Sequence, residues 1–98
     1  MVNPYTNKLL LAIVNRKARK IGHKVKPSTR KGKKLDVFNK EGKKVASIGA
    51  VGYNDFLLYK KKEGSKKANE RRKLYKIRHN KHRNKKGTPS YFADKILW

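Results

Sequence analysis

The chain contains no cysteine, and only six of its 98 residues are Asp or Glu. The absence of cysteine excludes disulfides, thiol catalysis and zinc sites with cysteine ligands. The shortage of acids leaves no pair of carboxylates in a plausible cleft, and the sequence has neither a nucleophile with histidine and a third partner nor a glycine-rich fingerprint. We therefore expect that the protein is not an enzyme, holds no cofactor and takes no small-molecule substrate.

Long apolar runs are also missing. The longest one extends from Leu9 to Val14, whereas a membrane-spanning helix needs roughly 20 apolar residues. The N-terminus lacks the charged, apolar and small-residue pattern of a signal peptide. We expect a protein that is made in the cytoplasm and is not secreted by the usual route.

Positive charge is abundant, with 29 Lys or Arg residues and a formal net charge of +23. Such an excess destabilises a compact chain by self-repulsion, and a partner that supplies negative charge relieves it. Hydrophobic residues make up 36% of the chain, below the roughly 45–50% of ordinary globular proteins, so we expect a thin core. The charge is uneven, because residues 60–87 hold 14 of the basic residues and two of the acids.

The pattern of apolar residues predicts one small domain over 1–98, of the α+β class. In the N-terminal segment 1–23, Asn3 and Pro4 are typical of a helix start, and helical spacing of apolar residues predicts a helix over about 4–21. In segment 24–50, short β-branched and aromatic runs on either side of a turn over 39–42 predict a two- or three-stranded antiparallel meander. A meander of this size is too small to stand alone, so we expect the helix to pack on it.

The last segment, 53–98, is predicted to be a basic helical half with an apolar end. Asn54 or Asp55 can cap a short helix that ends at Gly64, and Ser65 can cap a second helix that runs to about His79. A solvated basic loop is predicted over 80–87.

Thr88 and Pro89 repeat the cap-and-proline signal and predict a short terminal helix. Its apolar side chains are predicted to anchor the chain end, either in this chain's own core or in a neighbouring protein. The anchor residues are Tyr91, Phe92, Ile96 and Trp98.

The second predicted helix carries the strongest signal for an acidic partner. Closely repeated cations favour phosphate binding, since affinity arises from counterion release. The candidate contact residues are Lys67, Arg71 and Arg78 on one side of the helix, and Arg72 and Lys76 on another. A solvated surface helix is the alternative, but the near absence of acids in this row favours an acidic partner. The pattern gives no base specificity.

A basic loop over 28–34 supplies two more candidate contacts, Arg30 and Lys31. The loop has the composition of a phosphate-gripping loop but lacks the spacing of a P-loop. A solvated turn accounts for it equally well.

The histidines and the aromatic residues receive structural interpretations. His79 and His82 lie three residues apart but have no cysteine or acid nearby, so we interpret them as surface residues and predict no zinc site. The rings over 53–98 lie mostly on predicted helices, whereas single-strand-binding folds place stacking rings on strands. We interpret these rings as core residues.

Three stretches within roughly residues 24–98 have a distinctive order of residues. They are 26–31 (KPSTRK) followed by 35–37 (LDV), then 46–49 (ASIG), and a long C-terminal block from 68–79 (ANERRKLYKIRH) through 90–98 (SYFADKILW). In these stretches the chain resembles a family of small basic proteins of nucleocytoplasmic large DNA viruses, of the chlorella-virus type. The last block is the most specific, because composition does not force its order of charged and aromatic residues. No site residues transfer with this resemblance; it implies a viral context.

The resemblance and the charge together predict a structural virion protein, a minor capsid or cement component at the capsid or its inner face. Its expected partners are other capsid proteins, the major capsid protein above all, with viral DNA or an anionic inner membrane surface as further acidic surfaces. The alternative is a non-specific nucleic-acid-binding protein that packages or condenses viral DNA. A ribosomal-type protein is a third possibility.

Overall fold

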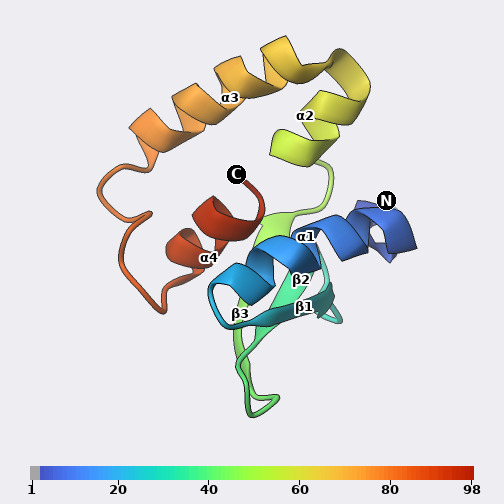
Figure 1. Ribbon diagram of the computed structural model, residues 1–98, viewed down its shortest axis with the longest axis vertical. Coiled ribbons are helices and arrows are strands. Elements are labelled where there is room, and N and C mark those ends of the chain that lie inside the picture. The colour runs from blue at the N-terminus through green and yellow to red at the C-terminus, as the bar shows by residue number, and fades with distance from the viewer. Residues whose placement is uncertain (1–2) are drawn as a thin grey trace.

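The computed structural model describes residues 3–98 and has an α+β architecture, as predicted (Figure 1). The chain begins with helices, continues through one antiparallel sheet and ends with three helices. The elements are η1 (Pro4–Thr6), α1 (Lys8–Lys20), β1 (Lys24–Pro27), β2 (Lys33–Phe38), β3 (Lys44–Ala50), α2 (Phe56–Glu63), α3 (Ser65–Arg78) and α4 (Pro89–Ile96).

The N-terminal helix starts later than the sequence predicts. Asn3 does cap a helical turn, but this is the single 3₁₀ turn η1, and the side chain of Asn7 starts α1 by accepting hydrogen bonds from the backbone of Leu9 and Leu10. The side-chain amide of Asn3 also donates to the carbonyl of Lys34 at 2.7 Å. This contact ties the start of η1 to the sheet, and the extended backbone of Asn7 separates η1 from α1.

The three strands form an antiparallel sheet in the order β1-β2-β3. Val25 pairs with Val37, and Leu35 pairs with Ile48, so apolar side chains share one face. The predicted turn over 39–42 is present: the Asn39 side chain accepts hydrogen bonds from the backbone of residues 41 and 43, and Gly42 has a φ of +80°. That left-handed conformation favours glycine.

The core lies between the sheet and two helices that are distant in sequence. Both α1 and α4 contact the sheet, and they also contact each other (Figure 1). The buried apolar residues of the cluster are Tyr5, Leu10, Val14, Ala18, Val25, Leu35, Val37, Ile48, Leu58, Phe92, Ile96 and Leu97. The terminal helix is therefore part of the main core.

Helices α2 and α3 form a bent pair (Figure 1), in which Leu58 of α2 reaches the core cluster. Asp55 caps α2, as the sequence predicts, and Gly64 ends it with a φ of +88°. The prediction that Ser65 caps α3 is wrong, because Gly64 occupies the cap position and no side chain bonds there. Thr88 caps α4 as predicted, with its hydroxyl accepting from the backbone of Tyr91.

Candidate anion-binding site

The candidate site is a pocket between α3 and the sheet. A buried ion pair between β2 and the residue that caps α2 lines its base. Lys34 Nζ lies 3.0 Å from Oδ2 of Asp55, and the two side chains are 2% and 1% exposed. The same oxygen accepts a hydrogen bond from the Tyr5 hydroxyl at 2.7 Å. Burial, reinforced by the adjacent carboxylate, raises the pKa of Tyr5 far above its usual range, so the hydroxyl stays a donor. The charge of Lys34 is thus neutralised inside the fold.

Two of the predicted contact residues on α3 turn toward the protein's own interior. The Arg72 guanidinium lies 3.5 Å from the centre of the Phe56 ring, a cation–π contact. Lys76 Nζ lies 2.6 Å from Oδ1 of Asp94, a carboxylate on α4 whose side chain is fully buried. Arg72 and Lys76 therefore help to hold α3 on the rest of the fold.

The other three predicted residues of α3, Lys67, Arg71 and Arg78, are exposed. Within residues 3–98, none of the three forms an ion pair with a carboxylate. Arg71 lies over the ring of Tyr59 at 5.5 Å, which limits the directions its guanidinium can take. Together with Lys66 and Lys73, which are also exposed and form no ion pair within residues 3–98, they present the unneutralised charge of α3.

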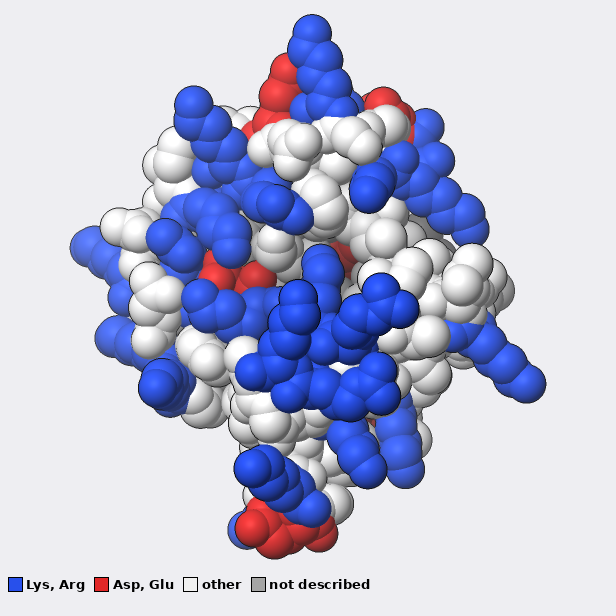
Figure 2. All heavy atoms as spheres, in the orientation of Figure 1, with Lys and Arg blue, Asp and Glu red and all other residues white. Residues whose placement is uncertain are grey.

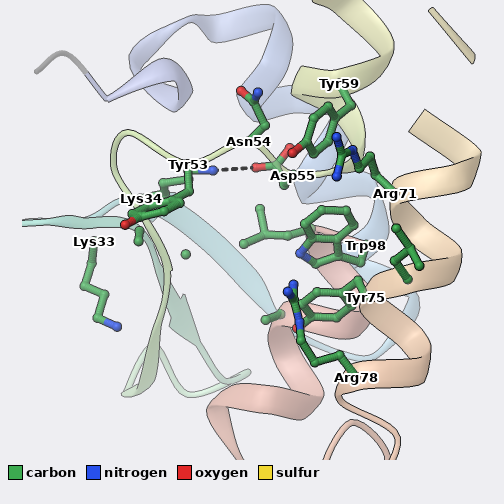
Figure 3. A pocket seen from close by; sticks show the side chains of 15 residues that line it. Lys33, Lys34, Tyr53, Asn54, Asp55, Tyr59, Arg71, Tyr75, Arg78 and Trp98 are labelled. Atoms are coloured by element: carbon green, nitrogen blue, oxygen red, sulfur yellow. Dashed lines mark hydrogen bonds and ion pairs between the residues drawn. The ribbon is translucent and has the colours of Figure 1, made fainter. Parts of the chain in front are cut away.

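Arg71 and Arg78 line a pocket of about 530 Å³ between α3 and the sheet (Figure 3). We call it the aromatic basic pocket. Lys33 and Tyr53 lie on one side of it, and Tyr59, Tyr75 and Trp98 lie on the other, beside the two arginines (Figure 3). The neutralised pair of Lys34 and Asp55 lies between the two sides. Three cations and four aromatic rings thus converge on one hollow.

The rings of Trp98 and Tyr75 form a stacked platform inside this pocket. Their centroids are 4.5 Å apart and their planes differ by 9°. His79 adds a further ring beside Tyr75, at 4.3 Å. Tyr53, by contrast, is 74% exposed, so the interpretation of the aromatic residues as core holds for Phe92 but not for Tyr53.

A second, shallower cleft of about 350 Å³ lies between α1 and α3. Lys17 and Lys20 from α1 meet Arg72 and Lys76 from α3 there, with Asp94 as the one carboxylate lining it. Burial and the nearby Arg72 charge lower the pKa of Lys17. Because Lys76 already binds Asp94, this cleft is partly neutralised from within.

The loop between β1 and β2 carries the other two predicted contacts, Arg30 and Lys31. Both side chains are exposed, and neither lines the aromatic basic pocket. The hydroxyl of Ser28 donates to Asp36 at 2.6 Å, so it is engaged in shaping the turn. Arg30 and Lys31 therefore do not join the α3 residues at the pocket, although Lys33, from the end of the same basic segment, does.

The predicted apolar anchor lies in the chain's own core. Phe92 and Ile96 are fully buried, while Tyr91 and Trp98 are partly buried and pack against the same cluster. The sequence left open whether the anchor lies in this chain's core or in a neighbouring protein. Phe92 and Ile96 lie in this chain's core. Trp98 also reaches the surface, because it lines both the aromatic basic pocket and the cleft beside α1.

His23 and His79 each lie beside an aromatic ring, and His82 is exposed. His23 packs edge-on against Phe92 at 4.8 Å, and its Nδ1 is 2.8 Å from the carbonyl of Ile21. Over residues 3–98 there is no group of three His, Cys, Asp or Glu residues arranged to hold a metal ion. In the same part of the chain, no helix is long and apolar enough to cross a membrane.

Comparison with known proteins gives no relative. No protein-family model matches the chain, and neither the curated proteins nor the solved structures contain a match.

Three further residues of the pocket, Lys33, Tyr53 and Tyr59, are not among the predicted contacts. Lys33 belongs to the predicted basic loop over 28–34 but is not singled out within it, and Tyr53 and Tyr59 are among the rings interpreted as core residues. An aromatic residue just outside a predicted helix was the one available signal for Tyr53. The convergence of these residues on α3 depends on the path of the chain between β3 and α2, which local patterns do not encode.

Proposed function

We propose that the protein is a non-catalytic structural component of a large DNA virus particle, a minor capsid or cement protein that binds acidic surfaces. The viral context rests on the resemblance of residues 24–98 described above. The binding mode rests on the charges of the folded molecule. Acidic faces of the major capsid protein are the partners we favour.

The observation that carries the proposal is the spread of exposed, unneutralised cations over separate elements, from α1 through the hairpin to α2 and α3. Among residues 3–98, five of the 29 basic side chains contact a carboxylate: Lys34, Lys44, Lys76, Arg83 and Lys95. Figure 2 shows Lys and Arg side chains over the whole visible face, not in one stripe. A protein surrounded by acidic neighbours needs charge on several sides, whereas one groove suffices for a single duplex.

The arrangement of the acids supports a non-catalytic role. Asp36, Asp55 and Asp94 are buried and paired with donors or cations inside the fold. The three glutamates are exposed, on the hairpin turn and on α2 and α3. Among the described residues, therefore, no two carboxylates face each other in an open cleft, as paired acid–base chemistry requires.

The experiment that tests the proposal locates the chain in the assembled particle. We expect repeated, symmetric copies in contact with the major capsid protein. Absence from that lattice, with the protein recovered in the fraction that contains the genome, contradicts the proposal.

Non-specific packaging of viral DNA is the second candidate, and the exposed row of Lys67, Arg71 and Arg78 on α3 favours it. Its test is duplex DNA binding between 50 and 300 mM salt. A packaging protein should bind at 150 mM, with a log–log salt slope of about −0.9 per phosphate contact. No binding at 150 mM excludes this candidate.

A further inference from the structure

We propose that the aromatic basic pocket binds single-stranded nucleic acid, with one base against its rings and the adjoining phosphates against its cations. The inference goes beyond the structural role proposed above and does not depend on it. It concerns the pocket lined by Lys33, Tyr53, Arg71, Arg78 and Trp98.

The charge of the pocket is available to a ligand. Asp55 is the one acid among the lining residues, and Lys34 and the Tyr5 hydroxyl already occupy it. Lys33, Arg71 and Arg78 form no ion pair within residues 3–98. Guanidinium groups match phosphate oxygens in a two-pronged geometry. Three positive charges therefore line a hollow with no competing carboxylate.

The rings of the pocket provide a surface for a base. Tyr53 is 74% exposed on the side opposite Trp98 (Figure 3). Exposed aromatic rings beside arginine are typical of single-strand binding, because every base has a flat face that can stack. The stacked pair of Trp98 and Tyr75 holds the second side rigid. At about 530 Å³, the pocket lies within the range of roughly 300–1,000 Å³ that small ligands occupy.

A single strand fits these features better than the two nearest alternatives. In a duplex the bases are stacked inside the helix, so their faces cannot reach Tyr53 or Trp98. An acidic peptide would satisfy the cations, but its carboxylates would leave the rings unused. The combination of flat rings and guanidinium groups is what favours a nucleotide unit.

The test uses the fluorescence of Trp98, which is the one tryptophan of the chain. The full-length protein is titrated at 150 mM salt with a thymidine oligonucleotide of six residues. Two control ligands follow: an abasic strand of the same length, and polyglutamate of the same charge. Because stacking contributes a large part of single-strand affinity, we expect the oligonucleotide to quench Trp98 and to bind about tenfold more tightly than the abasic strand.

Two pairs of variants distinguish binding in the pocket from the general effects of losing a charge or an apolar side chain elsewhere. Tyr53→Ala should weaken binding of the oligonucleotide about tenfold without changing binding of the abasic strand. Its control is Ile77→Ala, which removes a side chain of α3 that is 65% exposed and outside the pocket. Arg78→Gln should weaken binding of the oligonucleotide several-fold more than Lys67→Gln does, although both substitutions remove one charge from the same helix.

Equal affinity for the oligonucleotide and the abasic strand overturns the proposal. So does polyglutamate binding that matches the oligonucleotide, because the pocket would then be a site for acidic protein. Equal effects of Tyr53→Ala and Ile77→Ala also overturn it. None of these binding results bears on where the protein lies in the particle. Failure of this proposal is therefore distinct from failure of the capsid role.

Discussion

At the scale of single residues, the few acids of this chain determine where its positive charge appears. Each of the three aspartates is buried, and each has its own partners: hydroxyl groups for Asp36, Lys34 with Tyr5 for Asp55, and Lys76 for Asp94. Negative charge is thus used to hold the fold together. Most of the cations therefore remain at the surface without a carboxylate partner, which makes the surface strongly basic.

Asp36 makes the stability of the fold sensitive to acid. Burial raises the pKa of its carboxyl, but hydrogen bonds from Ser28, Ser47 and the backbone of Thr29 outweigh it, and the pKa lies below its usual value. The folded state therefore favours the ionised form. The stability gained is complete above the pKa that Asp36 has in the unfolded chain, about 3.9. It is lost as the pH falls through the lower pKa that Asp36 has in the folded state.

We predict that the free energy of unfolding of Asp36→Asn depends less on pH below about 4 than that of the unchanged protein. Urea unfolding, followed by Trp98 fluorescence at a series of pH values, measures it. Ser47→Ala, which removes one donor to the carboxylate, should move the acid transition to higher pH. If the free energy of unfolding falls equally at acid pH in the unchanged protein and in Asp36→Asn, then Asp36 does not contribute to the acid sensitivity.

At the scale of elements, α3 is attached to the rest of the fold through side chains. Arg72 lies on Phe56, Tyr75 stacks on Trp98, and Lys76 binds Asp94. The opposite surface of α3 is open, with Ile77 65% exposed. Since the aromatic basic pocket lies between α3 and the sheet, these attachments also set the shape of the pocket.

We predict that Asp94→Asn destabilises the protein by about 2 kcal/mol, because it leaves the cation of Lys76 without its partner in a partly buried site. Lys95 and Arg83 also lie near this carboxylate, at 3.2 and 3.8 Å. Denaturant unfolding measures the change. Glu70→Gln on the exposed face of α3 is the matched control, because it raises the net charge equally. Equal loss in both variants would assign the effect to net charge.

At the scale of the whole molecule, a net charge of +23 acts over a body only 37 Å long. At 10 mM ionic strength the Debye length is about 30 Å, so almost every cation repels every other one. At 100 mM it is about 10 Å, and the repulsion becomes local. The isolated fold is therefore least stable at low salt, and acidic surroundings replace the missing counter-charge.

We predict that the melting temperature rises by about 5 °C between 10 and 100 mM sodium chloride, which corresponds to roughly 1 kcal/mol. Thermal unfolding followed by circular dichroism measures it. A variant with Lys81, Lys85 and Lys86 replaced by Gln, all exposed in the loop before α4, should show a smaller rise. A melting temperature that falls with salt would contradict the idea that self-repulsion limits stability.

Local signals in the sequence predicted most of the fold. The turn at 39–42 and the cap at Thr88 were correct because their conformations depend on neighbouring residues alone. The start of α1 was wrong because Asn7, with an extended backbone, caps α1 through its own side chain, whereas the cap at Asn3 starts only a 3₁₀ turn. Helical spacing put Arg71 and Arg72 on different sides of α3, but it could not show which side faces the interior, since that depends on what lies under each side of the helix.

By itself, the sequence determined the α+β element order, the net charge and the concentration of cations over 60–87. These follow from composition, periodicity and caps, which act over a few residues. Tertiary structure alone decided which cations are free and what surrounds them. Packing turned Arg72 and Lys76 inward and brought Lys33 and Tyr53 opposite Arg71. The physical reason is that exposure and charge compensation are set by contacts between segments far apart in the chain.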